Sequence, residues 1–181
     1  MKRPGFIERH NLWTEAQKEA SEQIKAVVKE RDLLLIRTAW EDQHGIVRSK
    51  SLLPQAFFNA LSNGMQISTG TFLFDTGGAL VFNPFVSGGS LDMQEMTGAP
   101  NLVSVPDPHT FAIVPWAKRT GFILCDLYFQ NGRAMPLSSR GILRQSLAEL
   151  HQRGLEYIVG LEVEWYLAKL EDPMLDITHV G

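Results

Sequence analysis

A buried strand is predicted by the stretch Leu33-Leu-Leu-Ile-Arg-Thr-Ala-Trp40, a short and nearly continuous apolar run. It is followed by the turn residues Asp42-Gln-His-Gly45, and Ile46-Val-Arg-Ser-Lys50 then has the pattern of a second strand. Two strands joined by so short a turn predict a β-hairpin. We expect the first of them, together with a strand around residues 122–124, at the centre of a mixed sheet.

One helix is expected before this hairpin in the sequence and another after it. Residues 12–30 have apolar side chains at helical spacing, and Thr14 with Gln17 forms a capping-box pattern at the start. Pro54 can open a second helix, which Asn63-Gly64 ends. The first helix has a thin, Ala-rich apolar side, so we expect it to rest on the surface of something larger.

The rest of the chain is read as further strands, one helix and one long irregular segment. The expected elements are a strand at 71–75, an irregular segment at 76–100, two strands within 101–115, a strand at 120–128, a helix from Ser138 to Gly154 and a last strand at 157–170. This order is an α+β pattern and not a series of βαβ units. The five glycines of residues 76–100 favour a mobile segment in an isolated chain.

Composition narrows the class of protein. The 181 residues carry 17 Lys and Arg against 20 Asp and Glu, a net charge of −3, which argues against a general nucleic-acid binder. A single cysteine, Cys125, excludes an intrachain disulfide and favours a reducing compartment. No apolar run approaches the roughly 20 residues of a membrane-spanning helix, and no signal peptide is visible. We therefore expect a soluble, cytoplasmic protein with no membrane and no nucleic-acid partner.

Paired carboxylates occur in the stretch Gly160-Leu-Glu-Val-Glu-Trp-Tyr-Leu167. If it is a strand, Glu162 and Glu164 lie on one face about 7 Å apart, and the apolar residues lie on the other. Like charges at that spacing suit a hard divalent cation, which prefers carboxylate oxygen. The alternative is a strand with one solvated face, which commonly carries Glu.

Asp75 is a second candidate, because it precedes Thr76-Gly77-Gly78, where the lack of Cβ atoms lets a substrate approach the backbone. The alternative is an Asx-type turn, which Asp before Gly favours. The five histidines show no pair at metal-ligand spacing, and Cys125, within an apolar strand, is expected to be a buried, inert thiol. The sequence has no Walker-type phosphate-binding loop.

Five segments, in order, resemble the N-terminal part of the glutamine synthetase family. They are Asp42-Gln-His-Gly-Ile-Val-Arg-Ser-Lys50, Gly64 with Phe74-Asp75, Val105-Pro-Asp-Pro-His-Thr-Phe111 through Pro115-Trp116, Cys125-Asp126 with Gly132 and Arg140-Gly-Ile-Leu143, and Gly160-Leu-Glu-Val-Glu-Trp-Tyr-Leu167. The resemblance covers residues 30–181. Any one segment is weak, but five in order are specific.

The resemblance implies a β-grasp-like N-terminal domain followed by the first helix and strand of a catalytic domain. The expected divisions are an N-terminal helix at 1–29, the β-grasp domain at 30–128 and the truncated start of the catalytic domain at 129–181. Because the last elements normally pack on a sheet, we expect exposed apolar surface around Leu161, Val163, Trp165 and Leu167 or around residues 142–150. The family also implies ring-shaped homo-oligomers with active sites between subunits.

The activity implied is ATP-dependent ligation of ammonia, or an amine, to the γ-carboxylate of glutamate through γ-glutamyl phosphate. By position, Glu162 and Glu164 are expected to bind Mg²⁺ or Mn²⁺. Asp75 is expected to reach a neighbouring subunit's active site, bind the ammonium ion and deprotonate it, which suits a carboxylate base.

Two departures from the family pattern leave alternatives open. Thr-Gly-Gly follows Asp75 where ammonia-using enzymes usually have Gly-Ser-Ser, so a γ-glutamyl ligase for a polyamine or other primary amine is the second hypothesis. The sequence ends at Gly181, where family members continue for a few hundred residues, so we expect this chain to be inactive alone. A non-catalytic binding or regulatory β-grasp protein is the third hypothesis.

Overall fold

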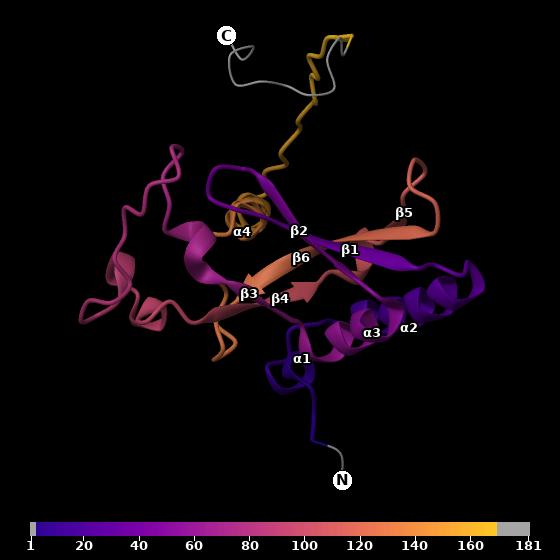
Figure 1. Cartoon of the computed structure of the whole chain (residues 1–181), viewed down its shortest axis with the longest axis horizontal. Coiled ribbons are helices and arrows are strands. Elements are labelled where there is room, and N and C mark those ends of the chain that lie inside the picture. Colours follow the sequence, from indigo (N-terminus) through magenta and orange to yellow (C-terminus); the bar gives the residue numbers. More distant parts are fainter. Residues whose placement is uncertain (1–2, 170–181) are drawn as a thin grey trace.

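A curled, six-stranded mixed sheet forms the body of the molecule, with helices on both sides of it (Figure 1). The computed structural model describes residues 3–169. The strands are β1 (Leu35–Glu41), β2 (Val47–Leu52), β3 (Met65–Ser68), β4 (Asn101–Pro106), β5 (Ala112–Ile113) and β6 (Thr120–Tyr128). Their order is β2-β1-β6-β4-β3, with β5 also paired to β6. Only β1 and β6 are parallel among these pairs, and they lie next to each other at the centre. This confirms the expected α+β, β-grasp-like fold.

The hairpin expected at the start of the sheet is present. β1 and β2 pair antiparallel from Ile36 opposite Leu52 to Glu41 opposite Val47. Gly45 in the connecting turn has a φ of +74°, a conformation that favours glycine. The sheet curls so that its two edge strands approach each other. Lys50 Nζ on β2 donates a hydrogen bond to the backbone oxygen of Gln66 on β3 at 2.7 Å.

Three helices cover one side of the sheet: α1 (Phe6–Arg9), α2 (Glu15–Glu30) and α3 (Pro54–Asn63). The capping box of α2 is confirmed, with Gln17 N donating to Thr14 Oγ1 at 3.3 Å and Thr14 N donating to Gln17 Oε1 at 3.0 Å. The three helices share one core with the sheet; its buried residues include Trp13, Val28, Ile36, Phe57, Val103 and Ile123. The expectation that the helix of residues 12–30 rests on a larger body by a thin side is confirmed, because α2 buries only Ser21, Ile24 and Val28.

A second core forms beneath the irregular segment that follows β3. Its buried members are Trp40, Ile67, Phe72, Leu73, Met96, Leu102, Leu127, Phe129 and Met135. Residues 76–100 contain no strand, as expected, and include only the short 3₁₀ helices η2 (Ser90–Asp92) and η3 (Gln94–Met96). Met96 is fully buried and fastens this segment to the core.

The strand predicted at 71–75 is wrong. The structure has the 3₁₀ helix η1 (Thr69–Phe72) there, and β3 lies just before it. The side chain of Ser68 accepts a hydrogen bond from Gly70 N and opens the helical turn. Phe72 and Leu73 are both buried in the second core, at 1% and 2% exposure. Consecutive side chains of a strand point to opposite faces, so a turn is needed to bury both on one side.

The helix α4 (Ser139–Gln152) lies on the other side of the sheet from α1–α3, and its cap by Ser138 is confirmed. The expected exposed apolar surface is confirmed in both places: Ile142 and Leu143 are each 53% exposed, and Leu161 and Leu167 are each 90% exposed. The strand predicted at 157–170 is wrong for residues 157–169, which have no regular structure; Leu170 lies outside the described residues. A strand must pair its backbone groups with a neighbouring strand, and the segment runs away from the sheet (Figure 1).

Candidate functional site

Asp75 lies in an exposed loop just after η1. Its Oδ1 accepts hydrogen bonds from the backbone N–H groups of Gly77 and Ala79, each at 2.9 Å, so the Asx-type turn is present. Its Oδ2 has no hydrogen bond within residues 3–169. The turn therefore fixes the carboxylate by one oxygen and leaves the other available to a ligand.

The tip of the β1–β2 hairpin holds the Asp75 loop. The side-chain amide of Gln43 donates a hydrogen bond to the backbone oxygen of Phe74 at 2.8 Å. The Nε2 atom of His44 lies 3.0 Å from the same oxygen, where the Nε2–H tautomer donates. Residues some 30 positions apart in sequence are thereby joined directly beside Asp75.

Asp42 organises the hairpin tip from within. Its fully buried carboxylate accepts hydrogen bonds from the backbone N–H groups of His44 and Ile46, at 2.9 and 3.0 Å, and from Arg48 Nε at 2.9 Å. Burial acts to raise the pKa of Asp42, but the hydrogen bonds from Arg48, Ile46 and His44 outweigh it and lower the pKa below its ordinary value. The carboxylate is thus held ionised and its partners are held in place.

A surface cavity of about 380 Å³ opens beside Asp75. Its lining comes from the hairpin tip and the Asp75 loop: His44, Ile46, Arg48, Thr71, Phe74, Asp75, Thr76 and Gly78. This cavity places a carboxylate oxygen next to apolar side chains, and the sequence patterns did not indicate it. The signal in the sequence is the Asp–x₅–Arg spacing of the hairpin, Asp42 to Arg48.

Glu162 and Glu164 lie in the irregular segment after α4, and both are exposed. Within residues 3–169 the structure brings together no group of three or more His, Cys, Asp or Glu side chains that would hold a metal ion. An octahedral ion such as Mg²⁺ needs about six oxygen ligands, and two carboxylates supply a fraction of them. The described residues therefore do not by themselves fit a resident divalent ion.

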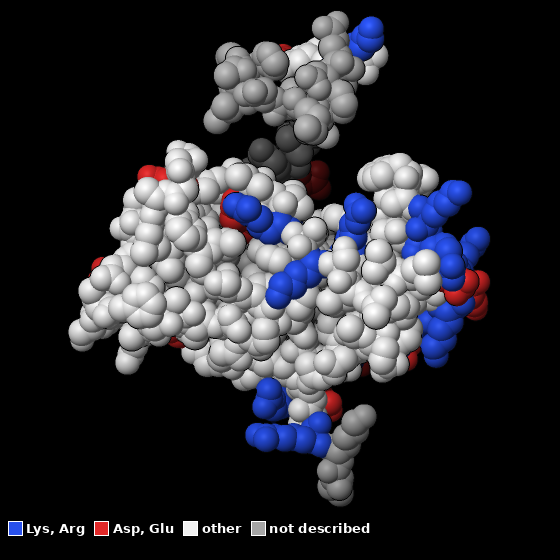
Figure 2. All heavy atoms as spheres, viewed as in Figure 1, with Lys and Arg blue, Asp and Glu red and all other residues white. Residues whose placement is uncertain are grey.

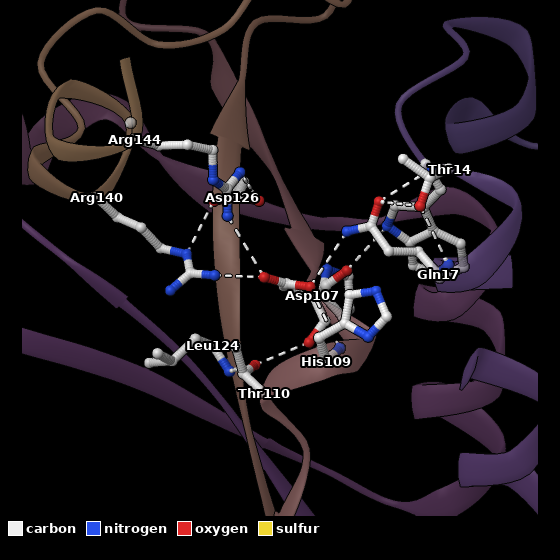
Figure 3. Close-up of polar contacts among 12 residues, drawn as sticks. Thr14, Gln17, Asp107, His109, Thr110, Leu124, Asp126, Arg140 and Arg144 are labelled. Carbon is white, nitrogen blue, oxygen red and sulfur yellow. Dashed lines mark hydrogen bonds and ion pairs between the residues drawn. The ribbon is translucent and has the colours of Figure 1, made fainter. Parts of the chain in front are cut away.

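An ion-pair network attaches α4 to the sheet (Figure 3). Arg140 on α4 binds Asp107 through Nη2 and donates from Nε to Asp126 Oδ1 on β6 at 3.0 Å. Arg144, one turn further on, donates from Nη1 to Asp126 Oδ2 at 2.8 Å and also contacts Asp107 at 3.4 Å. No residue of α4 is buried, so these polar contacts dominate its attachment to the sheet.

Asp107 also binds the N-terminal helix. Gln17, the capping-box residue of α2, donates from Nε2 to Asp107 Oδ1 at 3.1 Å (Figure 3). One carboxylate, just before the 3₁₀ helix η4 (Pro108–Thr110), thus joins α2 and α4 on opposite sides of the sheet. This role of Asp107 was not predicted. For the ion pairs of α4, the signal in the sequence is a pair of arginines four residues apart and an aspartate in the apolar strand β6.

Cys125 lies outside these clusters. Cys125 is free and buried, as expected, and burial raises its pKa to about 12, which disfavours the reactive thiolate. Figure 2 shows Lys and Arg side chains scattered on this face, with Asp and Glu among them at one end, and no continuous basic band on it. Among residues 3–169, no helix has both the length and the apolar character needed to cross a membrane.

Comparison with known proteins gives a consistent set of relatives. Gamma-glutamylanilide synthase from an Acinetobacter species is 38% identical over 179 residues, covering 97% of this chain and 36% of that protein. Glutamate–isopropylamine ligase from a Pseudomonas species is 31% identical, covering 88% and 34%, and glutamine synthetase from Methanosarcina mazei is 29% identical, covering 88% and 33%. No family model matches the chain.

Solved structures show the same fold. Apo GmaS aligns with a TM-score of 0.54 at 19% identity, covering 71% of this chain and 26% of that one. GmaS with ADP aligns with a TM-score of 0.53 at 20% identity, covering 71% and 25%. The chain belongs to the glutamine synthetase family and corresponds to the N-terminal part of its members. It spans about a third of the length of the curated relatives it matches.

Proposed function

We propose that the complete protein is an ATP-dependent ligase that joins an amine to the γ-carboxylate of glutamate, and that this chain supplies the amine-facing part of its site. The observation that carries the proposal is the 38% identity to a gamma-glutamylanilide synthase over 97% of the chain. The Thr-Gly-Gly sequence after Asp75 supports an amine larger than ammonia, because it departs from the usual pattern of ammonia-using enzymes. Ammonia itself is the second candidate, supported by the similarity to a glutamine synthetase.

The reaction proposed has two steps. The γ-carboxylate of glutamate attacks the γ-phosphorus of ATP, which forms γ-glutamyl phosphate and releases ADP. The amine nitrogen then attacks the acyl carbon, the C–O bond to phosphate breaks, and the products are the γ-glutamyl amide and inorganic phosphate. An alkylammonium ion must lose one proton to become the nucleophile, and Asp75, with its free carboxylate oxygen, is the base we assign to that proton.

Glu162 and Glu164 are proposed as two ligands of a Mg²⁺ or Mn²⁺ site that other residues of the complete protein must finish. This rests on their place in the stretch that resembles the family, Gly160-Leu-Glu-Val-Glu-Trp-Tyr-Leu167. The bound ion would supply charge neutralisation for phosphoryl transfer. The chain alone is proposed to be inactive, since it spans about a third of its relatives.

The proposed partners are ATP, glutamate, the amine and further copies of the same protein. Support for self-association comes from the irregular segment, where Leu80, Val81, Phe85 and Val86 are 46–76% exposed. Contiguous apolar surface of this kind marks interaction sites in many proteins. Because the reaction consumes ATP, the cytoplasm is the location proposed.

The test is a substrate screen on the complete gene product. Glutamate, ATP and Mg²⁺ are supplied with ammonia, isopropylamine or aniline, and phosphate release is measured together with the amide by mass spectrometry. We expect ATP-dependent amide formation, fastest with one of the two organic amines. Absence of amide with all three nucleophiles would refute the ligase assignment.

The assigned residues are tested in the same assay. In Asp75→Asn, the amide oxygen can still accept the N–H groups of Gly77 and Ala79, so the turn is retained while the base is lost. We expect kcat to fall about 10²–10⁴-fold with unchanged circular dichroism. Glu164→Gln is expected to abolish ligation and to weaken Mn²⁺ binding measured by electron paramagnetic resonance. Unchanged turnover in either variant would remove that residue from the proposal.

A further inference from the structure

We propose that the cavity between the hairpin tip and the Asp75 loop binds the carbon substituent of the amine, and that Ile46 determines which substituents are accepted. This rests on the proposed function and names the substrate contact within it. The cavity forms one wall of the amine site, and its lining residues come from two segments of this chain, 44–48 and 71–78.

The size of the cavity favours a substituted amine. An ammonium ion occupies about the space of a water molecule, whose share of liquid volume is about 30 Å³. The cavity has about 380 Å³ and falls in the range of about 300–1,000 Å³ that is typical of sites for organic ligands. Ammonia alone would leave most of this space to water.

The lining offers both polar and apolar groups to a ligand. The free oxygen of Asp75 suits an ammonium ion or the N–H of a neutral aryl amine. Ile46 and Phe74, which are 50% and 40% exposed, are the large apolar side chains of the lining. Covering them with a hydrocarbon group removes apolar surface from water, which is favourable.

Several of the other polar groups of the lining are already engaged. Arg48, the one Lys or Arg in the lining, pairs with the buried Asp42 at 2.8 Å. The backbone oxygen of Phe74 receives Gln43 and His44. Asp75 is the one carboxylate in the lining, so it is the group that suits an ammonium ion, and an amine with one polar end matches it.

The wall is also held rigidly enough to discriminate. Asp42 accepts the backbone N–H of Ile46 at 3.0 Å, so the main chain at the proposed specificity residue is fixed by a buried carboxylate. A pocket set in this way loses little entropy when the ligand binds. The side chain at position 46 then sets the room left for the substituent.

The experiment compares Ile46→Trp with Val47→Trp in the complete gene product. Val47 is the next residue, is 58% exposed and does not line the cavity, so it is a matched control for adding an indole to this strand end. The quantity measured is kcat/KM for isopropylamine divided by kcat/KM for ammonia. We expect Ile46→Trp to lower this ratio at least tenfold, because the indole fills the space of the substituent, and Val47→Trp to leave it unchanged.

The outcomes separate the two proposals. A wild-type protein that ligates ammonia but neither amine overturns the subsite and leaves the ligase assignment standing. A wild-type protein that ligates amines, with the same ratio in Ile46→Trp, also overturns the subsite. If the ratio falls equally in Ile46→Trp and Val47→Trp, the effect does not depend on the cavity, and the role of Ile46 in specificity is refuted. If the wild type forms no amide with any nucleophile, the proposed function fails and the subsite fails with it.

Discussion

Asp42 does not line the cavity, but its buried carboxylate holds in place several residues that do. Its hydrogen bonds fix the backbone of His44 and Ile46 and the side chain of Arg48, all of which line the cavity beside Asp75. A charged acceptor with several donors stabilises a fold more than a neutral one does. The consequence is a pH-dependent contribution to stability centred on the hairpin.

We expect Asp42→Asn to lower the free energy of unfolding by about 1.5–3 kcal/mol at pH 7, because charge-assisted hydrogen bonds are lost. The pKa of Asp42 is lower in the folded state than in the unfolded state, so its contribution is complete above the unfolded value of about 3.9 and is lost as the pH falls through the folded pKa. The difference between wild type and variant should therefore shrink at low pH.

Urea unfolding at pH 7 and at pH 3 measures this difference. The exposed Asp92 is the control, because it forms no ion pair within residues 3–169, and Asp92→Asn should change stability by less than about 0.5 kcal/mol. A constant difference across the pH range would contradict the assignment of an ionised Asp42.

Residues whose partners are close in sequence were predictable, and those with distant partners were not. The capping box of Thr14 and Gln17 follows from three-residue spacing. The burial of Cys125 follows from its apolar neighbours. The contact of Gln17 with Asp107 spans 90 positions, and no local pattern specifies it. The hydrogen bond from Gln43 to the backbone oxygen of Phe74 spans 31 positions and is likewise not specified by a local pattern.

At the scale of elements, prediction succeeded where local signals and partners both lie within the chain. The expected strand at 120–128 matches β6 (Thr120–Tyr128), and α3 begins at Pro54 and ends at Asn63 before Gly64, as its terminal residues indicate. The strand expected at 157–170 has the right alternation but has no neighbouring strand within residues 3–169. Alternation describes side chains, whereas a strand also needs hydrogen-bond partners.

The docking of α4 on the sheet should depend on the ion pairs of Arg140. Arg140→Gln removes the guanidinium that joins Asp107 to Asp126, two carboxylates of 7% and 14% side-chain exposure. We expect α4 to dock less stably by about 1.5–3 kcal/mol, with Arg144 keeping part of the attachment. Hydrogen exchange measured by mass spectrometry should show faster exchange in α4 and unchanged exchange in β1 and β6.

Arg153→Gln is the control for this variant, because Arg153, just after α4, forms no ion pair within the described chain. It should leave the exchange of α4 unchanged. Equal exchange in wild type and Arg140→Gln would mean that the network does not hold the helix.

At the scale of the whole molecule, the fold combines a well-buried body with surfaces that have no partner in this chain. The two cores lie beneath the helices and beneath the irregular segment. Apolar side chains are exposed on α4, on residues 155–167 and on residues 80–91. The central place of β1 and β6 in a mixed sheet was predicted from the sequence. The curl of the sheet, which brings β2 near β3, was not, because it involves long-range contacts such as that of Lys50 with Gln66.

The segment at 80–91 exposes several large apolar side chains. Figure 2 shows that the part of the surface over this segment, at the left of the view, is almost free of charged side chains. Phe85 is 76% exposed there, in a segment that also exposes Leu80, Val81 and Val86, and exposed apolar patches mark interaction sites. We expect this segment to form a contact between copies of the complete protein, so that Phe85→Glu weakens the assembly by placing a charge in an apolar interface.

Sedimentation velocity of the complete gene product measures the assembly. Phe85→Glu should shift the population towards smaller species at micromolar concentration, with unchanged circular dichroism. Leu53→Glu is the control, since Leu53 is 65% exposed just before α3 and lies outside the segment, and an acidic residue is favourable at a helix N-terminus. If both variants keep the mass of the wild type, residues 80–91 are not the contact. If Leu53→Glu dissociates as well, the loss of assembly is caused by added charge in general and not by the change at Phe85.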